Sequence, residues 1–254
     1  MANALQGRHA LITGGGSGIG AAAAESLAGA GAKVSLLGRR LEPLQQTAKR
    51  LGGYAVSCDV TQADQIANAF DEARAINGPI EMLVVNAGIA ESAPFHKMSR
   101  DSWDRIISVN LTAAFECSRA AIADLLKSES GRLVFVASVA SLRGVPYAAH
   151  YAASKHGLLG LSRSLAAEYA KTNLTVNAVC PGYVDTPMTD QSVARVSEIT
   201  GRSANEARSA ITNMNASARL VDPEAIANII LMLCLPLSRD INGAAITIDG
   251  GTSA

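Results

Sequence analysis

Tyr151 and Lys155 are four residues apart, a spacing that places two side chains one turn apart on the same face if the segment is helical. An isolated tyrosine keeps its proton up to a pKa of about 10. A fixed positive charge within about 4–6 Å favours the phenolate and lowers that pKa, and the Lys155 ammonium could supply the charge. The pair therefore predicts a proton-transfer site. The competing interpretation is an amphipathic helix whose Tyr and Lys only meet solvent.

Length and composition limit the classes of protein to which the chain could belong. Its 254 residues are 48% hydrophobic, enough to bury the core of one large α/β domain. Lys plus Arg and Asp plus Glu both number 22, so the net charge is zero and no single-sign field favours nucleic acid or a membrane as partner. Without a basic leader or a run of about 18 apolar residues, we expect a soluble cytoplasmic protein in which residues 1–254 form one domain.

The cysteines at positions 58, 117, 180 and 234 are far apart and include no Cys-x-x-Cys pair. This distribution favours reduced core thiols over a disulfide framework or a zinc site. We therefore expect no bound metal.

Short apolar runs alternate with longer helical patterns along the whole chain. Strands that are apolar on both faces and separated by helices predict a parallel sheet covered on both sides, with right-handed crossovers. The expected strands are residues 9–13, 33–37, 54–57, 82–85, 133–137, 174–179 and 245–248.

A glycine-rich turn at residues 13–20 follows the first strand and leads into an Ala-rich helix at 21–30. Glycines let the backbone approach a ligand closely, and a helix N-terminus offers free N–H groups and a positive dipole end to a phosphate. The turn therefore predicts a pyrophosphate site, with a merely flexible turn as the alternative.

The second strand ends in Gly38-Arg39-Arg40, where dinucleotide-binding folds often place a carboxylate for the adenosine ribose. Glycine followed by arginine instead leaves room for a 2′-phosphate and provides Arg39 to pair with it. The pattern favours NADP(H), with NAD(H) still possible. Two solvated arginines at a strand end are the competing explanation.

The third strand closes at Asp59-Val60, just before Thr61, which we expect to cap a helix with Asp64 three residues on. Asp59 could take part in this capping or contact an adenine.

Two further strand ends and one helix carry polar residues at unusual places. Asn86-Ala87-Gly88 follows the fourth strand, at the edge where parallel sheets hold ligands, and Ser138 ends the fifth. Asn110 lies in the middle of a helix expected at 99–126, where asparagine is unfavourable. Because a buried amide needs partners, Asn110 either satisfies a local backbone kink or serves a site.

Residues 186–220 are richer in Ser, Asn and Thr than the rest, and predict a short helix pair that forms a lid over the site. Asp222-Pro223-Glu224 then predicts a helix start, with a capping acid and proline at the first helical position.

The order of these motifs resembles that of the short-chain dehydrogenase/reductase family over essentially the whole chain. The motifs are Thr13-Gly-x-x-x-Gly-Ile-Gly20, Asn86-Ala-Gly88, Asn110, Ser138, Tyr151-x-x-x-Lys155 and Pro181-Gly182. The resemblance implies a Rossmann-type, doubly wound α/β fold with seven parallel strands and helices on both faces. It also implies a nicotinamide cofactor and a homotetramer assembled through the helices that contain Asn110 and Tyr151.

The resemblance implies catalytic roles for four residues. Tyr151 is the general acid for carbonyl reduction and the base for alcohol oxidation, and Ser138 hydrogen-bonds the substrate oxygen. Lys155 lowers the pKa of Tyr151 and holds the nicotinamide ribose, while Asn110 ties a water to Lys155. The implied cofactor-binding residues are Gly14, Ser17, Gly18, Ile19, Gly20, Arg39, Asp59, Val60, Asn86, Ala87, Gly88, Tyr151, Lys155, Pro181, Gly182, Val184 and Thr186.

We expect an oxidoreductase that moves a hydride between nicotinamide and a carbonyl or secondary alcohol. The chain is most similar to 3-oxoacyl-thioester reductases and 3-hydroxyacyl dehydrogenases, which favours a 3-oxoacyl thioester or acid, and a hydrophobic or aryl ketone is the alternative. The expected substrate pocket is Ser138, Tyr147, Tyr183 and Met188, with further candidates at Ser141, Leu142, Arg143, His150 and Met214.

Two readings from other classes remain. A catalytically silent nucleotide-binding regulator would have no need of the intact Ser-Tyr-Lys set. A sugar-nucleotide epimerase would need a separate substrate domain that 254 residues hardly accommodate.

Overall fold

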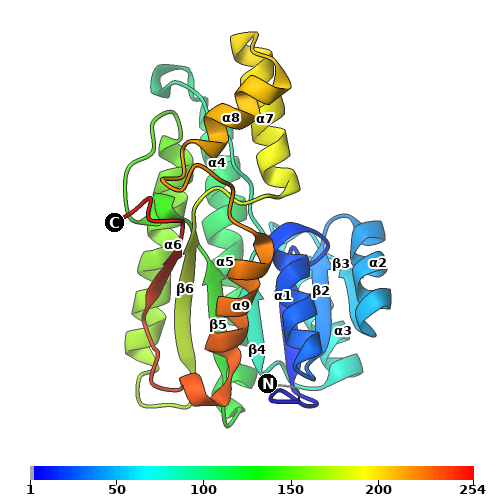
Figure 1. The fold of residues 1–254 in the computed structure, drawn as a ribbon. Helices are drawn as coiled ribbons and strands as arrows, with labels where there is room; N and C mark the ends of the chain where they lie inside the picture. Colours follow the sequence, from blue (N-terminus) through cyan, green and yellow to red (C-terminus); the bar gives the residue numbers. More distant parts are fainter. Residues whose placement is uncertain (1–2) are drawn as a thin grey trace.

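The computed structural model describes residues 3–254, in which seven parallel strands form one sheet between two layers of helices, as predicted (Figure 1). The sheet order is β3-β2-β1-β4-β5-β6-β7. The inner strands β1, β4 and β5 are buried along their whole length because helices cover both of their faces. The strands are β1 His9–Thr13, β2 Lys33–Gly38, β3 Tyr54–Ser57, β4 Met82–Val85, β5 Arg132–Val136, β6 Thr175–Pro181 and β7 Ala245–Ile248. Residues 1 and 2 of the expected domain lie outside the described residues.

Three strands differ from their predicted bounds, since β2 spans residues 33–38 rather than 33–37, β5 132–136 rather than 133–137, and β6 175–181 rather than 174–179. β2 extends to Gly38, which pairs with Ser57, and β6 extends to Pro181, which pairs with Ile248. β5 begins at Arg132, a residue that the apolar pattern excluded although it is buried in the sheet.

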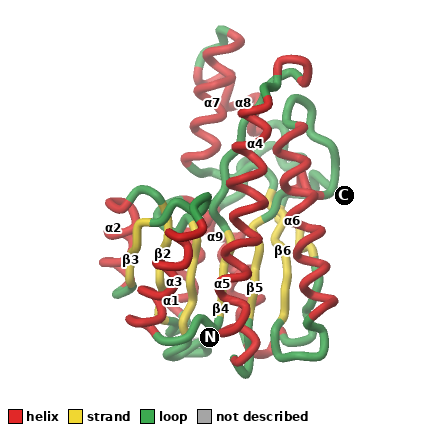
Figure 2. The backbone as a smooth tube through the Cα atoms, turned by 180° about the vertical axis from the view of Figure 1, so that it is seen from behind, coloured by secondary structure: helices red, strands yellow, loops and turns green. Residues whose placement is uncertain are grey.

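Each face of the sheet has its own layer of helices. One core cluster joins the sheet to α3, α5 and α6, and the other joins it to α1, α2 and α9 (Figures 1 and 2). The helices are α1 Gly18–Gly29, α2 Leu41–Leu51, α3 Ala63–Asn77, α4 Arg100–Ile107, α5 Ala113–Lys127, α6 Ala149–Glu168, α7 Pro187–Thr200, α8 Ala204–Thr212 and α9 Pro223–Cys234.

The predicted helix at residues 99–126 is observed as one continuous helix, Arg100–Lys127, that contains a π-helical turn at Ser108–Thr112 between α4 and α5. It is long and apolar enough to cross a membrane by length and composition, but a core helix passes the same test. Here α5 packs against the sheet and α3, so the apolar face is explained by the core.

The predicted helix starts needed three corrections. The glycine turn is shorter than expected, because α1 already begins at Gly18. Gln62, rather than Thr61, is the N-cap of α3, since the Thr61 hydroxyl donates to the Asp59 carboxylate at 2.8 Å. Asp222 occupies the N-cap position of α9 ahead of Pro223, as expected, but its side chain makes no capping hydrogen bond.

Candidate active site

A cleft of about 390 Å³ opens at the carboxyl ends of β1, β2 and β4, where the strand order reverses between β1 and β4. Ligands in doubly wound sheets bind at this kind of switch point, because the chain leaves neighbouring strands toward opposite faces. The cleft, here called the β1–β4 cleft, is lined by Gly14, Gly16, Ser17, Gly38, Arg39, Arg40, Pro43, Leu44, Cys58, Val60, Ala87, Gly88, Ile89 and Val109.

The turn between β1 and α1 has no room for side chains. Gly14 has a φ of 68°, and a Cβ on Gly20 would overlap the Gly14 carbonyl oxygen and lie 2.5 Å from the Asn86 Nδ2 atom. The Asn86 amide donates to the Thr13 and Gly14 carbonyls at 3.0 and 3.2 Å, which joins the ends of β1 and β4. The α1 N-cap, Ser17, makes no side-chain capping bond, so it leaves the first-turn N–H groups free for an anion.

At the end of β2, both Arg39 and Arg40 are exposed and line the cleft. The lining residues include no carboxylate. Asp59 lies nearby, but its carboxylate accepts from the Thr61 N–H and hydroxyl at 3.0 and 2.8 Å. These hydrogen bonds, aided by the charge of Arg39, hold the pKa of Asp59 below its ordinary value. Asp59 therefore forms a local turn, and its contact with adenine remains a prediction.

Tyr151 and Lys155 occupy the first two turns of α6, as their spacing predicted, and Ser138 follows the end of β5. The Lys155 Nζ atom lies 5.8 Å from the centre of the Tyr151 ring and donates to the Val136 carbonyl at 2.9 Å. Gly88 lies beside the same ammonium, since a Cβ there would be 3.7 Å from Nζ. The fold thus brings the Ser-Tyr-Lys set and the β4 edge together.

We expect Lys155 to lower the pKa of Tyr151, and in the protein alone burial acts against that effect. Burial raises the pKa of Tyr151, while its hydrogen bond with Ser138 acts in the opposite direction, and Lys155 is not among the causes. Burial also lowers the pKa of Lys155 to about 8. Desolvation disfavours the charged form of both groups, so an effect of Lys155 on the pKa of Tyr151 remains a prediction.

Asn110 does not bond the backbone of its own turn but bonds two other segments, and its role in the site remains a prediction. It lies in the π-helical turn, is buried, and its Oδ1 accepts from the Ile89 N–H at 2.9 Å. Its Nδ2 donates to the Ile89 carbonyl at 3.0 Å and to the Ser154 Oγ at 3.1 Å. The Asn110 amide thereby connects three segments: the loop after β4, helix α6, and the π-helical turn between α4 and α5.

The segment after β6 forms the predicted helix pair, α7 and α8, which rises above the carboxyl edge of the sheet (Figure 1). Thr186 reaches the glycine turn, since a Cβ on Gly18 would be 3.0 Å from its Cγ2. Arg208 on α8 forms ion pairs with Asp185 and Asp190 at 2.6 and 2.8 Å. The helix pair is therefore linked to the loop that contains Thr186.

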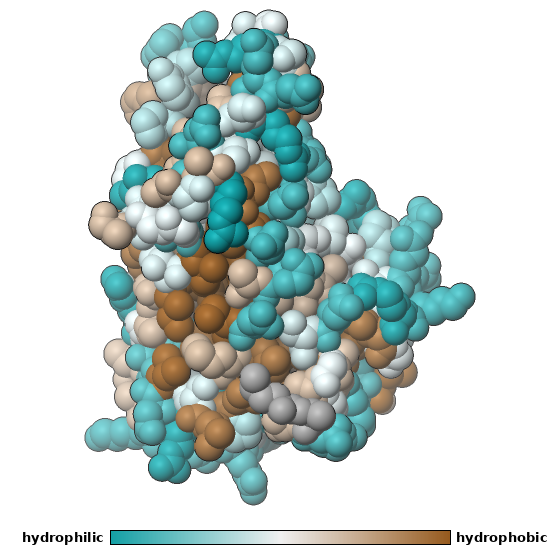
Figure 3. Space-filling model, viewed as in Figure 1, coloured by the Kyte–Doolittle hydropathy of each residue, from teal (hydrophilic) through white to brown (hydrophobic). Residues whose placement is uncertain are grey.

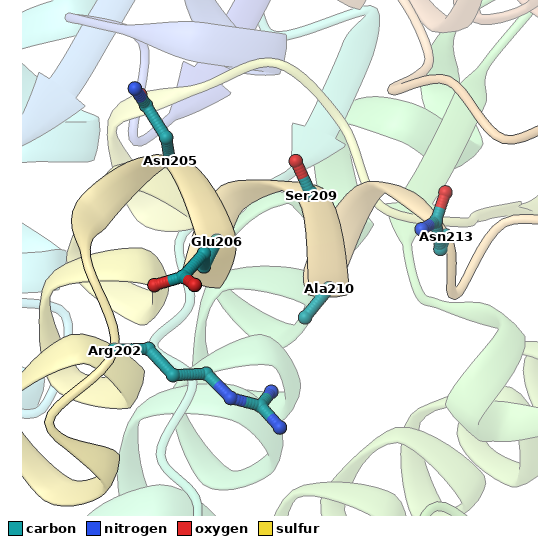
Figure 4. Close-up of a pocket in the computed structure, with 6 residues that line it drawn as sticks. All are labelled: Arg202, Asn205, Glu206, Ser209, Ala210 and Asn213. Atoms are coloured by element: carbon teal, nitrogen blue, oxygen red, sulfur yellow. The ribbon is translucent and has the colours of Figure 1, made fainter.

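A second hollow, of about 470 Å³, lies on α8 and the loop before it. Figure 4 shows that its lining side chains point to different sides of the helix rather than toward one point. None of the residues that the sequence singled out for chemistry lines it, so we do not connect it with the site.

The family model for short chain dehydrogenases matches residues 8–197. The chain belongs to the short-chain dehydrogenase family. It is 35% identical over 244 residues to the 3-oxoacyl-[acyl-carrier-protein] reductase MabA of Mycobacterium tuberculosis, covering 96% of this chain and 92% of that protein. It is 37% identical to the cis-4-hydroxycyclohexanecarboxylate dehydrogenase of Sinomonas cyclohexanicum, with full coverage of both.

Two solved structures support the same family. A crystal structure of an actinorhodin polyketide ketoreductase variant with NADPH matches with a TM-score of 0.93 and 33% identity, covering 100% of this chain and 99% of that one. Levodione reductase matches with a TM-score of 0.92 and 30% identity, covering 98% of both chains. As a short-chain dehydrogenase, the protein is a nicotinamide-dependent oxidoreductase that acts on a carbonyl or secondary alcohol.

The β1–β4 cleft fits such a cofactor, because its glycine surface and the free first turn of α1 suit a pyrophosphate. Of the expected cofactor residues, Gly14, Ser17, Arg39, Val60, Ala87 and Gly88 line this cleft. Other expected cofactor residues, Pro181, Gly182, Val184 and Thr186 among them, lie outside its lining, as do Asp59, Tyr151 and Lys155.

Some cleft residues were missed by the sequence reading. Cys58, Ile89 and Val109 directly adjoin Asp59, Gly88 and Asn110, which were singled out, so one more position beside each would have found them. Pro43 and Leu44 carry no sequence signal, because only the packing of α2 against the glycine turn brings them there.

The expected substrate pocket is not one closed cavity in the described residues. Ser138 is buried, whereas Tyr147 is 67% and Met188 38% exposed, and Tyr183 is half-buried. Neither of the two hollows described above includes them. Their contact with substrate therefore remains a prediction.

Proposed function

We propose that the protein is an NADPH-dependent reductase of 3-oxoacyl thioesters. The observation that carries the proposal is the group of relatives named 3-oxoacyl-[acyl-carrier-protein] reductases, at 34–39% identity. The arginine-lined, carboxylate-free end of the cleft supports NADPH as the cofactor.

The proposed roles of the catalytic residues are those that the family resemblance implies. A nicotinamide dinucleotide held along the β1–β4 cleft supplies the hydride. Tyr151 donates a proton to the carbonyl oxygen, and Ser138 donates a hydrogen bond to the same oxygen as charge develops on it. Lys155, beside Gly88, holds the ribose hydroxyls, and a water bound by Asn110 connects Lys155 to solvent, so that a proton can be returned to Tyr151. The raised pKa of Tyr151 suits reduction, because a phenol that keeps its proton is the form that acts as an acid.

A second candidate substrate is a hydrophobic, alicyclic or aryl ketone. Relatives named for a hydroxycyclohexanecarboxylate and a polyketide favour it. Apolar side chains of the expected pocket region, Leu142, Tyr147, Met188 and Met214, are exposed, which leaves apolar surface for such a substrate. A silent nucleotide-binding regulator has less support, since it would have no need of the Ser138, Tyr151 and Lys155 side chains that the chain carries.

The experiment that tests the proposed activity follows NADPH absorbance with acetoacetyl-CoA, acetoacetate and a bulky aryl ketone. We expect the thioester to be the fastest substrate. Tyr151→Phe should lower its turnover by roughly 10²–10⁴-fold, because the proton donor is gone, while NADPH still binds.

Tyr54→Phe is the matched control, since the Tyr54 hydroxyl lies on β3 and bonds only Glu72. It should leave turnover unchanged. A Tyr151→Phe enzyme with a near-normal rate would refute the assigned acid. Turnover of the aryl ketone alone would replace the thioester with the second candidate.

Arg39→Ala is expected to weaken NADPH by about 10–100-fold and to leave NADH unchanged, because only NADPH has the 2′-phosphate that the guanidinium would pair with. Steady-state KM values for both cofactors measure this. Arg50→Ala is the control, because Arg50 lies at the exposed end of α2 and forms an ion pair with Glu25 of α1. Equal losses with both cofactors would contradict the phosphate contact.

We propose further that residues 186–220 form a lid that closes when cofactor binds. The link from Arg208 through Asp185 to Thr186 supports this, because Thr186 lies against the glycine turn. NADPH should slow amide hydrogen exchange across α7 and α8, and Arg208→Ala should reduce that slowing. Exchange that is unchanged by NADPH would argue against a lid.

The protein is also proposed to be a cytoplasmic homotetramer. Phe115 on α5 and Trp103 on α4 are exposed apolar side chains on the helix expected at the interface. Hydrophobic residues also gather over α9 and the edge strand β7 (Figure 3), among them Ile229, Met232 and Ile246. Sedimentation velocity should give a tetramer of the 26.2 kDa chain, and Phe115→Glu should dissociate it. A monomeric wild type would overturn this part of the proposal.

A further inference from the structure

The helix that carries Tyr151 and Lys155 has no ordinary cap at its N-terminus. Its N-cap residue is Ala148, which has no side-chain acceptor. The first hydrogen bond within the helix runs from the Ala152 N–H to the Ala148 carbonyl at 2.8 Å, so the Tyr151 N–H is the last of the orphan donors. A Ser, Thr, Asn or Asp at the cap would normally accept such a donor.

His150 takes that donor instead. The Tyr151 N–H donates to the His150 Nδ1 atom at 2.9 Å, and the imidazole is fully buried. Because Nδ1 accepts, the proton of the neutral ring must lie on Nε2, which has no hydrogen-bond partner among the described residues. This interaction requires an imidazole without a proton on Nδ1.

The surroundings of His150 come from three other elements. Glu91, in the loop after β4, is held by the Ser102 hydroxyl at 2.8 Å and by Arg105 of α4 at 2.6 Å. Arg195 of α7 also acts on the imidazole. Burial and the two arginines lower the pKa of His150, while Glu91 raises it, and the net direction is downward. The neutral ring is therefore the form present at neutral pH.

We propose that His150 is a positioning residue that fixes the backbone of Tyr151, and that protonation of His150 in mild acid releases it. Protonation puts a hydrogen on Nδ1, which then faces the Tyr151 N–H instead of accepting it. The first turn of α6 loses its only cap at the catalytic tyrosine, and the phenol loses its fixed position relative to the substrate oxygen. This inference rests on the proposed role of Tyr151 as proton donor.

The kinetic test compares three variants under saturating substrate and cofactor. His150→Ala should lower kcat about tenfold, the scale of a lost helix cap, with little change in the KM for NADPH. His150→Asn should recover most of kcat, because its Oδ1 can stand where the imidazole places Nδ1 and accept the same N–H. His156→Asn is the matched control, since His156 is exposed on the same helix and bonds the Ala152 carbonyl.

The pH profile separates positioning from a merely structural role. Wild type and His156→Asn should lose kcat as the pH falls below about 6.5, with an apparent pKa under the ordinary histidine value. His150→Asn should lack that acid limb, because an amide does not titrate. An acid limb that persists in a folded His150→Asn protein overturns the proposal, and so does a His150→Ala enzyme with wild-type kcat.

A nuclear magnetic resonance titration needs no turnover and so distinguishes this inference from the proposed function. In wild type, the His150 ring should show the Nε2–H tautomer, and the Tyr151 amide signal should move with the same pKa as the ring. If the two signals titrate together while no carbonyl substrate is reduced, the proposed substrate fails but the cap stands. A Tyr151 amide that ignores the His150 titration refutes the cap itself.

Discussion

The site depends on one constraint of the sheet: β1 and β4 are neighbours, but the chain leaves them toward opposite faces. After β1 it enters α1 on one layer, and after β4 it reaches α4 and α5 on the other. The space between the two exits is the β1–β4 cleft. Asn86 holds the two strand ends together beside the cleft, because its side-chain amide donates to the carbonyls of Thr13 and Gly14.

The catalytic helix is held against this cleft from several sides. Asn110 bonds Ser154 on α6 and Ile89 after β4, while Lys155 bonds the Val136 carbonyl at the end of β5. Each of these partners is buried or part-buried, where an unsatisfied polar group is costly. The π-helical turn places Asn110 to make these bonds, so this turn and the site belong to the same arrangement.

Desolvation explains why the protein alone does not activate Tyr151. Burial raises the pKa of the phenol and lowers that of Lys155 to about 8, so desolvation acts against the charged form of both groups, although the lysine stays mostly protonated at pH 7. Moving a tyrosine pKa from about 10 to about 7 requires roughly 4 kcal/mol of differential stabilisation. Alcohol oxidation would have to draw that stabilisation from the Lys155 ammonium together with the positive charge of an oxidised nicotinamide. Carbonyl reduction needs no such shift, because it uses the protonated phenol.

Most of the fold was predictable, because each inner strand is buried on both faces and its run of apolar residues can therefore be recognised in the sequence. The errors lie where pairing or packing decides: Arg132 begins β5 although it is charged, and β6 continues to Pro181 because β7 lies beside it. Helix starts were also misplaced by one to three residues, and in one case the Thr61 hydroxyl donates to Asp59, two residues before it, instead of capping the helix.

The sequence by itself determined the family, the strand ends that carry the site, and the pairing of Tyr151 with Lys155 on one helical face. These depend on spacing along a strand or a helix, which the covalent chain already sets. Only the tertiary structure decided the protonation preferences of Tyr151 and Lys155, the partners of Asn110 and the contact between His150 and the Tyr151 backbone. Burial and hydrogen bonding between distant segments set these properties, and neither quantity exists until the elements have packed together.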